Sequence, residues 1–199
     1  MLRRVVDVVC ALILLLITAP LLAAGALAVL IGSGRPIFFG HTRVGRGGKL
    51  FRCWKLRTMT PCAERVLQHA PALRQRYIEN GFKLGNGEDP RITREGRWLR
   101  RSYVDEIPQF FNVLSGTMSL IGPRPVVLEE LALYGDGVEE LLQWRPGIFG
   151  EWTSRGRRRP DYPERARLEL EFIRNRSIRR DLMVLLRSIP VVLRGQDGR

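Results

Sequence analysis

The sequence predicts an α+β fold that is mainly helical, with a short β-hairpin, in a single domain behind an N-terminal membrane segment. Three observations predict it. The stretch from Val8 to Ile31 contains no charged residue, residues 36–59 read as two extended segments around a glycine-rich turn, and helical spacing of apolar residues begins at Asp105. A chain of 199 residues can bury one core and leaves little room for a second domain.

The composition indicates an anionic partner and a reducing environment. The formal net charge is +13, and arginine greatly outnumbers lysine, which favours bidentate contacts with phosphate. On charge alone the candidates are phosphates, an anionic membrane surface and nucleic acid. The cysteines, Cys10, Cys53 and Cys62, form no C-x-x-C pair, so we expect thiols rather than disulfides or a zinc site. His41 and His69 lack metal-ligand spacing and are expected to be ordinary surface or hydrogen-bonded histidines.

The segment from Val8 to Ile31 is long enough to cross a bilayer core, but two details favour another path. Pro20 lies near its middle, where it removes a backbone hydrogen bond and bends a helix. Both flanks are basic, which the positive-inside rule accommodates if the helix enters, bends at Pro20 and leaves on the same face. An ordinary kinked transmembrane helix is the alternative, and the residues alone favour neither. We expect Asp7 to pair with Arg3 or Arg4, one turn away.

Residues 36–59 are expected to form two extended segments around the turn at Gly45–Gly48. Alternation in the second segment places Lys55 and Arg57 on the same face, where they could clamp a phosphate. Spacing alone favours a solvated strand face. The run GRGGK is not a P-loop, because it lacks the glycine–lysine–hydroxyl spacing and a following helix. Residues 61–82 then predict a short helical stretch broken at Pro71, of structural or lid character.

An adjacent pair of carboxylates, Asp105 and Glu106, stands out in so basic a chain. The pattern becomes helical there, with a polar face formed by Asp105, Gln109 and Asn112 and an apolar face formed by Ile107, Phe110, Phe111 and Leu114. Since Pro108 is tolerated only near a helix start, the helix should begin close to Asp105. Asp105 could therefore be a plain N-cap, or half of a capping box with Ser102, while Glu106 complements the helix dipole.

The surroundings of the carboxylate pair favour a metal-bound phosphate site over a simple cap. A helix N-terminus already attracts anions, and Arg100 and its neighbouring arginine precede this one by about a turn. Beyond the helix, Pro123 and Pro125 stiffen the backbone around Arg124, which suits phosphate or nucleotide recognition. Mg²⁺ usually takes one or two protein carboxylates and completes its shell with phosphate oxygens and water. The pair is therefore a candidate set of magnesium ligands.

Six motifs run in order along nearly the whole chain: RRVVD, RPIFFGHTRVG, FRCWKLRTM, DPRITREGRWLRRSYVDEIPQFFNVLSGTMSLIGPRP, RPGIFG and FIRNRSIRRDL. In these motifs the chain resembles the bacterial monotopic phosphoglycosyl transferases, in their minimal catalytic form. The resemblance implies a re-entrant membrane helix at residues 1–34 and a catalytic domain at residues 35–199 on the cytoplasmic face of the bacterial inner membrane. It also implies transfer of a sugar 1-phosphate from a UDP-sugar to polyprenol (undecaprenyl) phosphate, with release of UMP, as the first membrane step of glycan assembly.

The resemblance implies roles for single residues. Asp105 matches the aspartate nucleophile, which forms a covalent phosphosugar intermediate, and Glu106 matches the second member of the dyad, which helps with the metal or the acceptor. The implied cofactor is Mg²⁺, held by Asp105 and Glu106. The implied partners are the UDP-sugar, the polyprenol phosphate and the lipid bilayer, with no nucleic acid and with room for a homodimer. Substrate contacts are implied for a further set of residues: Lys55, Arg57, Arg100, Arg124, Pro125, Arg145 and Glu169.

Four departures from the family pattern stand out. Ala19 precedes Pro20 where a serine is usual, so the bend in the membrane segment must rest on the proline alone. His41 stands where glutamine is usual, and Glu169 stands where a third acidic residue is usually aspartate. After RPGIFG the usual Gly-Trp-Ala-Gln run becomes GEWTSRGRRR, which leaves the sugar or nucleotide contacts of residues 151–159 unassigned.

Residues 161–195 read as two helices, of which the second is basic and strongly apolar. This helix could lie in the membrane interface or in the core, and periodicity does not decide. Two other function classes fit the residues. A membrane-tethered basic module for nucleic acid or anionic lipid suits the composition but leaves the carboxylate pair and GPRP unexplained. A metal-dependent phosphodiesterase that uses water as the acceptor suits the pair as well.

Overall fold

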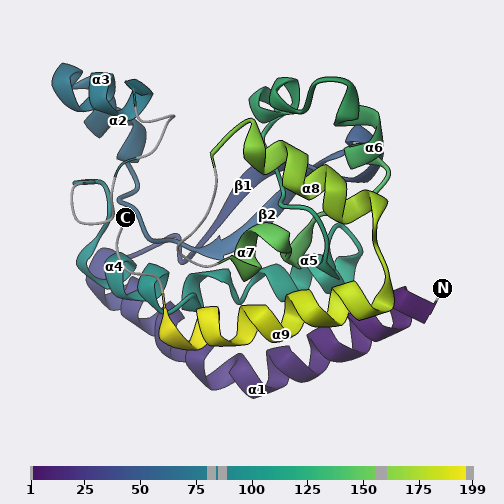
Figure 1. The fold of residues 1–199 in the computed structure, drawn as a ribbon. Helices are drawn as coiled ribbons and strands as arrows, with labels where there is room; N and C mark the ends of the chain where they lie inside the picture. The colour runs from purple at the N-terminus through teal and green to yellow at the C-terminus, as the bar shows by residue number, and fades with distance from the viewer. Residues whose placement is uncertain (1, 80–83, 85–88, 156–160, 196–199) are drawn as a thin grey trace.

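The computed structural model describes the chain except for residues 1, 80–83, 85–88, 156–160 and 196–199. Helices α1 and α9 lie along the base, the other elements stand on them, and α2 and α3 form an arm apart from the main body (Figure 1). The prediction of a mainly helical α+β fold with a short hairpin is confirmed. The elements, with η for short 3-10 helices, are α1 (Leu2–Ser33), β1 (Phe38–Val44), η1 (Arg46–Gly48), β2 (Leu50–Leu56), α2 (Ala63–Gln68), α3 (Pro71–Glu79), α4 (Arg94–Arg101), η2 (Val104–Glu106), α5 (Gln109–Ser115), β3 (Ser119–Ile121), η3 (Leu128–Gly137), α6 (Val138–Leu142), β4 (Gly147–Phe149), α7 (Glu151–Ser154), α8 (Glu164–Arg174) and α9 (Ile178–Arg194).

Helix α1 is continuous over 32 residues, with Pro20 inside it. Pro20 therefore does not end the helix, which bows beneath the rest of the molecule (Figure 1). Gly25 lets α1 approach the body closely, since a Cβ there would stand 2.8 Å from Leu56 Cδ1 and 2.9 Å from Val104 Cγ1. Because Val104 begins η2, the membrane segment packs directly against the turn that carries the carboxylate pair.

Both ends of α1 are hydrogen-bonded to the same body. Near the N-terminus the Asp7 carboxylate accepts from the Ser119 hydroxyl at 2.7 Å and from the Leu120 amide at 3.0 Å. At the other end, Nη2 of Arg57 donates to the carbonyl and the hydroxyl of Ser33 at 2.7 and 2.9 Å. The two ends of the apolar segment are therefore held on one side of it.

The expected pairing of Asp7 with an arginine one turn away is wrong. Nη2 of Arg3 lies 3.8 Å from the Asp181 carboxylate on α9, and Nη2 of Arg4 donates to the Leu114 carbonyl at 3.1 Å. The charged residues at the start of α1 reach other elements instead of one another. Such partners, more than a hundred positions away for Asp7 and Arg4, leave no trace in local spacing.

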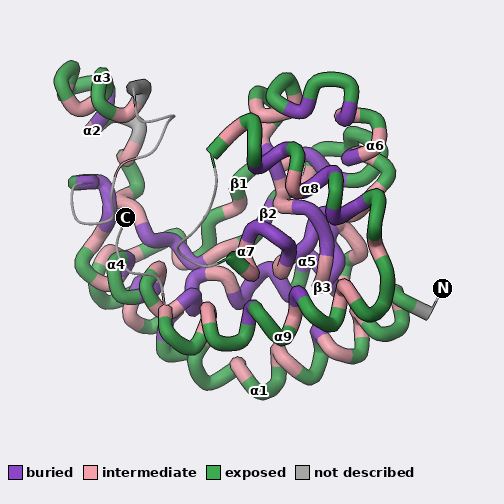
Figure 2. The backbone as a smooth tube through the Cα atoms, in the orientation of Figure 1, coloured by how far each residue is buried: buried purple, intermediate pink, exposed green. Residues whose placement is uncertain are grey.

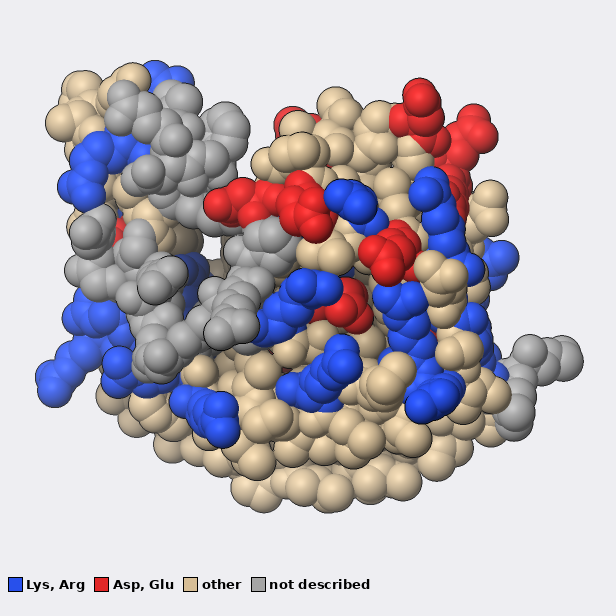
Figure 3. Space-filling model, in the orientation of Figure 1, with Lys and Arg blue, Asp and Glu red and all other residues tan. Residues whose placement is uncertain are grey.

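The base formed by α1 and α9 is apolar and largely exposed (Figure 2). Among the described residues one helix, Arg3–Ser33, is long and apolar enough to cross a membrane. Figure 3 shows an uncharged lower rim with Lys and Arg side chains above it. In α9 Val184 and Ser188 are buried, whereas other apolar side chains of the helix are exposed: Leu182, Leu186, Ile189 and Leu193. One face of α9 thus packs in the core, and another face is exposed at the base of the molecule.

The predicted hairpin is confirmed, with β1 and β2 antiparallel and His41 opposite Cys53. A side chain from α5 closes the outer edge of β2. Oδ1 of Asn112 accepts from the Trp54 amide at 2.9 Å, and Nδ2 donates to the Arg52 carbonyl at 2.7 Å. The buried amide takes the place of a third strand and fixes α5 against the hairpin.

Over the described residues, two hydrophobic clusters make up the core. One joins α1, β2, α4 and α5 around Val113, and the other joins η3, α6, α8 and α9 around Phe172. Strands β3 and β4 form a short parallel pair, with Ser119 opposite Gly147. Ile121, the last residue of β3, packs against both clusters, so the loop that follows starts where the clusters meet.

Three further local expectations, on the break at Pro71, the histidines and the cysteines, are confirmed over the described residues. Helix α2 ends before Pro71, which begins α3, while residues 80–82 of the predicted helical stretch lie outside the described part. Nδ1 of His41 lies 3.0 Å from a backbone carbonyl, and Nδ1 of His69 lies 2.8 Å from another. The cysteines carry free thiols: Cys10, Cys53 and Cys62.

Candidate active site

A pocket that opens to solvent, with about 600 Å³ of empty space when the adjoining open solvent is included, lies between the hairpin, η2, the loop after β3 and helix α7. Among the described residues, its charged lining consists of Arg43, Lys55, Glu106 and Arg124. Trp152 on α7 forms part of the wall. Three cations against one carboxylate suit an anionic ligand.

The carboxylate pair lies in η2 and not at a helix N-cap. Tyr103, just before η2, takes a left-handed φ of 58°, which no other non-glycine residue in the described part does. The hydroxyl of Ser102 donates to the Trp98 carbonyl at 3.0 Å, inside the preceding helix. Helix α5 begins only after Pro108, which makes no side-chain cap. The alternative of a plain cap or a capping box at Asp105 is therefore wrong, and the helix expected to begin close to Asp105 begins at Gln109.

Lys55 neutralises the pair from the hairpin. Its Nζ lies 2.6 Å from Oε1 of Glu106. Burial lowers the pKa of Lys55, but the charges of Glu106 and Asp105 raise it, and the net shift is upward. The ammonium group therefore stays charged beside the two carboxylates.

Asp105 is the more deeply buried member of the pair, with 6% of its surface exposed. Burial raises the pKa of Asp105 to about 7, with Lys55 opposing the rise and Glu106 adding to it. Glu106 lines the open pocket and Asp105 does not. A ligand in the pocket therefore meets Glu106 first, and the buried Asp105 is the preceding residue in the chain.

Arg100 lies in the electrostatic field of Asp105 without lining the pocket. Its Nε donates to the Thr58 hydroxyl at 2.9 Å. Burial lowers the pKa of Arg100, and the charge of Asp105 opposes that shift. Arg100 thus supplies positive charge to the buried carboxylate.

The expectation that Lys55 and Arg57 project together is wrong. Lys55 reaches Glu106, whereas Arg57 is buried against Ser33 at the C-terminal end of α1. The strand ends at Leu56, so its alternation no longer fixes the direction of Arg57. Arg57 therefore anchors the C-terminal end of α1.

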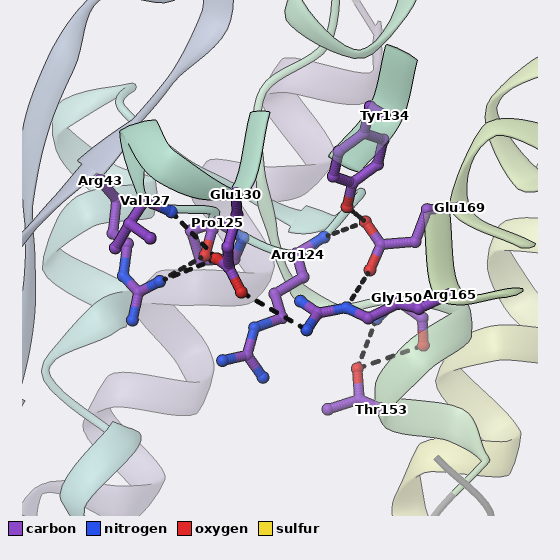
Figure 4. A network of polar contacts seen from close by, with 10 residues as sticks. All are labelled: Arg43, Arg124, Pro125, Val127, Glu130, Tyr134, Gly150, Thr153, Arg165 and Glu169. Atoms are coloured by element: carbon purple, nitrogen blue, oxygen red, sulfur yellow. Dashed lines mark hydrogen bonds and ion pairs between the residues drawn. The ribbon is translucent and has the colours of Figure 1, made fainter. Parts of the chain in front are cut away.

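Buried side chains fix the loop that carries Arg124 (Figure 4). Oε2 of Glu169 accepts from the Arg124 amide at 3.1 Å and from the Tyr134 hydroxyl at 3.0 Å. Oε1 of Glu169 lies 3.5 Å from Nε of Arg165, and Nη1 of Arg165 lies 3.7 Å from Glu130. Arg165 and Glu169 are 1% and 2% exposed, so their charges are compensated within the protein.

Arg43 and Glu130 hold the next part of the same loop. Nη1 of Arg43 donates to the Pro125 carbonyl at 3.3 Å and lies 3.5 Å from Oε2 of Glu130. The same carboxylate oxygen accepts from the Val127 amide at 3.0 Å. Arg43 therefore both lines the pocket and fixes Pro125.

The Arg124 side chain extends away from Glu169 (Figure 4). Within the described part of the chain, no hydrogen bond or ion pair reaches its guanidinium, which contacts the Trp152 ring. Burial lowers the pKa of Arg124, and the charges of Arg165 and Arg43 lower it further. An anion in the pocket would stabilise this cation.

Besides Arg57 and Arg100, two more residues expected to contact substrate lie outside the pocket. Nε of Arg145 donates to the Gly116 carbonyl at 2.9 Å and so caps the end of α5. Glu169 lies behind the Arg124 loop and acts on its backbone. Neither lines the pocket. Both are tied to positions distant in the chain, which residue spacing does not reveal.

The carboxylate pair fits Mg²⁺ by its chemistry. Among the described residues no group of three His, Cys, Asp or Glu side chains converges on a metal site. Mg²⁺ needs only one or two protein carboxylates when phosphate oxygens complete its shell. Asp105 and Glu106 provide two such groups, of which Glu106 is shared with Lys55.

Sequence reasoning did not assign Arg43, Gln109 or Trp152 to the site, although all three line the pocket. Gln109 had a signal, because it shares the polar helix face of Asp105. Arg43 was indistinguishable from the other basic residues after the membrane segment. Trp152 belongs to the stretch 151–159, of which residues 156–159 lie outside the described part.

Comparison with known proteins finds one family and several relatives. The family model described as bacterial sugar transferase matches residues 1–195. The chain is 42% identical to the undecaprenyl-phosphate galactose phosphotransferase of Salmonella typhimurium, over 99% of this chain and 41% of that protein. It is 38% identical to the exopolysaccharide production protein ExoY of Sinorhizobium fredii, over 96% of this chain and 84% of that protein. It is 39% identical to the UDP-glucose:undecaprenyl-phosphate glucose-1-phosphate transferase of Caulobacter vibrioides, over 96% of this chain and 69% of that protein. The chain thus spans about two fifths of the Salmonella protein and most of ExoY.

Proposed function

The chain belongs to the bacterial sugar transferase family, and from that premise we propose that it is an enzyme that transfers a sugar 1-phosphate from a UDP-sugar to undecaprenyl phosphate. The products are UMP and an undecaprenyl diphosphate sugar, the first lipid-linked intermediate of a glycan. The Caulobacter relative is named for UDP-glucose and undecaprenyl phosphate, which supports both substrate classes.

The observation that carries the proposal is the charge arrangement of the pocket. Arg43, Lys55 and Arg124 surround a space that Glu106 also lines, and the buried Asp105 is next to Glu106 in the chain. Three cations suit a diphosphate, which carries several negative charges. A carboxylate with a pKa of about 7 is available as a nucleophile near neutral pH.

The first step is a displacement at the phosphorus that bears the sugar. An ionised carboxylate oxygen of Asp105 attacks this phosphorus and forms a new P–O bond. The bond from the same phosphorus to the bridging oxygen of the diphosphate breaks, and UMP leaves with that electron pair. Arg43 and Arg124 hold phosphate oxygens while the charge moves toward UMP.

The second step regenerates the carboxylate. A phosphate oxygen of undecaprenyl phosphate attacks the same phosphorus, and the bond to Asp105 breaks with its electron pair returning to the carboxylate. Lys55 holds Glu106 in place beside the reacting group. When bound by Asp105 and Glu106, Mg²⁺ supplies charge neutralisation for the diphosphate.

A membrane location follows from the substrate and is supported by the base of the molecule. The exposed apolar faces of α1 and α9 suit the bilayer in which the polyprenol chain is dissolved. Both ends of α1 are anchored to one body, which supports a helix that enters and leaves on the same face. With basic flanks on both sides, that face is the cytoplasmic face of the bacterial inner membrane.

The reaction is tested with the full chain in membranes, labelled UDP-sugars, Mg²⁺ and undecaprenyl phosphate. We expect UMP and lipid-linked label in equal amounts, and a phosphosugar adduct on Asp105 by mass spectrometry when the lipid acceptor is omitted. UMP formed without any acceptor would instead identify a hydrolase that uses water. If no donor is turned over, the chain is instead a non-catalytic binding module.

A further inference from the structure

The ring of Trp152 contacts two guanidinium groups. Cζ of Arg165 lies 4.2 Å from the ring centroid and Cζ of Arg124 lies 5.3 Å from it. Cations within about 6 Å of an indole centroid are attracted by its π electrons. Arg165 also lies 4.8 Å from the ring centroid of Tyr162. The ring of Trp152 therefore contacts the positively charged groups of both Arg165 and Arg124.

The two arginines differ in the charges that balance them. Arg165 is 1% exposed, lies within ion-pair distance of Glu130 and Glu169, and does not line the pocket. Arg124 lines the pocket and makes no ion pair within the described part of the chain. The charge of Arg165 is thus balanced inside the protein, whereas the charge of Arg124 is available to bind an anionic ligand in the pocket.

Trp152 is well placed to control the direction of Arg124. The Arg124 backbone is already fixed through its amide by Glu169 and by prolines on both sides, so its side chain is the variable part. Trp152 is 8% exposed and sits on α7, whose first turn is closed by the Gly150 amide donating to the Thr153 hydroxyl at 2.7 Å. A ring held in this way offers Arg124 a fixed π surface and fills the space beside Arg165.

We propose that Trp152 is a positioning residue that holds the Arg124 guanidinium toward the pocket, where it forms the subsite for a phosphate oxygen of a nucleoside diphosphate donor. The identity of the donor rests on the proposed function, whereas the role of the ring rests on the contacts alone. Trp152 itself need not touch the reacting atoms.

The test measures binding of inorganic diphosphate to the detergent-solubilised full chain by calorimetry. We expect Trp152→Leu, which fills space without a π surface, to weaken binding about 10-fold, and Trp152→Phe to stay within about 3-fold of the native affinity. Trp98→Leu, at an exposed position of α4, is the matched control and should leave binding unchanged. Thermal unfolding of each variant checks that it folds, and Trp152→Met replaces Trp152→Leu if the latter does not.

A double-mutant cycle separates positioning from general support of the fold. If Trp152 acts through Arg124, adding Trp152→Leu to Arg124→Met should cause no further loss of diphosphate affinity. An additive loss would overturn the proposal. So would native-like affinity in Trp152→Leu, or a native chain that binds no inorganic diphosphate.

The same variants distinguish failure of this inference from failure of the proposed function. If the chain turns over no UDP-sugar but diphosphate binding follows the expected pattern, the proposed function falls and the positioning role stands. If turnover is normal and Trp152→Leu binds diphosphate as the native chain does, the positioning role alone falls.

Discussion

Nζ of Lys55 lies 2.6 Å from Oε1 of Glu106, the residue that follows the buried Asp105. One lysine from the hairpin therefore faces two adjacent carboxylates, which explains how the pair is tolerated. The lysine does not cancel the cost of burying Asp105, whose pKa still rises to about 7. The state of this dyad should consequently change within the physiological pH range.

We expect kcat/KM for the donor to fall as the pH falls below about 7. The attacking group must be ionised, and the ionised fraction of Asp105 drops about tenfold per pH unit well below its pKa. The measurement is initial UMP release at saturating acceptor across the pH range. A profile that stays flat down to about pH 5 would contradict the assignment of Asp105 as nucleophile.

Asp105→Asn should abolish turnover and stabilise the fold at high pH. Because burial raises the pKa of Asp105 in the folded state, its favourable contribution to stability is present at low pH and is lost as the pH rises through about 7. The melting temperature of the variant should therefore exceed that of the native chain at about pH 8.5 and approach it at about pH 5. Near-normal UMP release by the variant would remove the proposed mechanism.

Lys55→Met should lower activity at neutral pH and move the pH profile upward. Lys55 opposes the rise in the pKa of Asp105, so its removal should raise that pKa further. We expect at least about a tenfold loss of kcat/KM at pH 7, partly recovered at higher pH. Arg52→Met, an exposed position on the same strand, is the control and should leave the profile in place.

Asn112→Ala should reduce the free energy of unfolding by about 2–4 kcal/mol. The substitution leaves the Trp54 amide and the Arg52 carbonyl without their partner at the edge of β2. Denaturant unfolding of the solubilised chain measures the effect, and Ser115→Ala, an exposed position on the same helix, gives the baseline. A change below about 0.5 kcal/mol for Asn112→Ala would mean that the strand edge does not need the amide.

Both ends of α1 should be accessible from the cytoplasm. We expect single cysteines introduced by Leu2→Cys and Arg35→Cys, in a chain without its native thiols, to react with an impermeant maleimide only after the inner membrane is opened. Labelling of position 2 in intact spheroplasts would instead establish an ordinary transmembrane helix.

The hairpin and the carboxylate pair were predictable because their signals are local. Alternation around the glycine turn and helical spacing after Asp105 are visible in a few residues. Most of the proposed assignment of roles came from family resemblance and not from spacing.

Several charged residues expected to contact substrate instead bind distant segments of the chain. Arg57 turns to α1, Arg145 caps α5, and Glu169 holds the Arg124 backbone from 45 residues away. Each is a basic or acidic residue that could equally have faced a substrate. Which charged groups are hydrogen-bonded within the protein, and which face the pocket, depends on how the helices pack.

Asp7 hydrogen-bonds α1 to β3, and Gly25 lets η2 pack closely on the same helix, so α1 supports both the turn that carries the carboxylate pair and the strand that precedes the Arg124 loop. With α1 in the bilayer, as proposed, hydrophobic mismatch that tilts this helix should shift the carboxylate pair and the Arg124 loop with it. Turnover should then depend on acyl-chain length in reconstituted vesicles, and Asp7→Ala, which loosens the linkage, should flatten that dependence. Bilayer thickness is thereby expected to affect the rate of the proposed reaction.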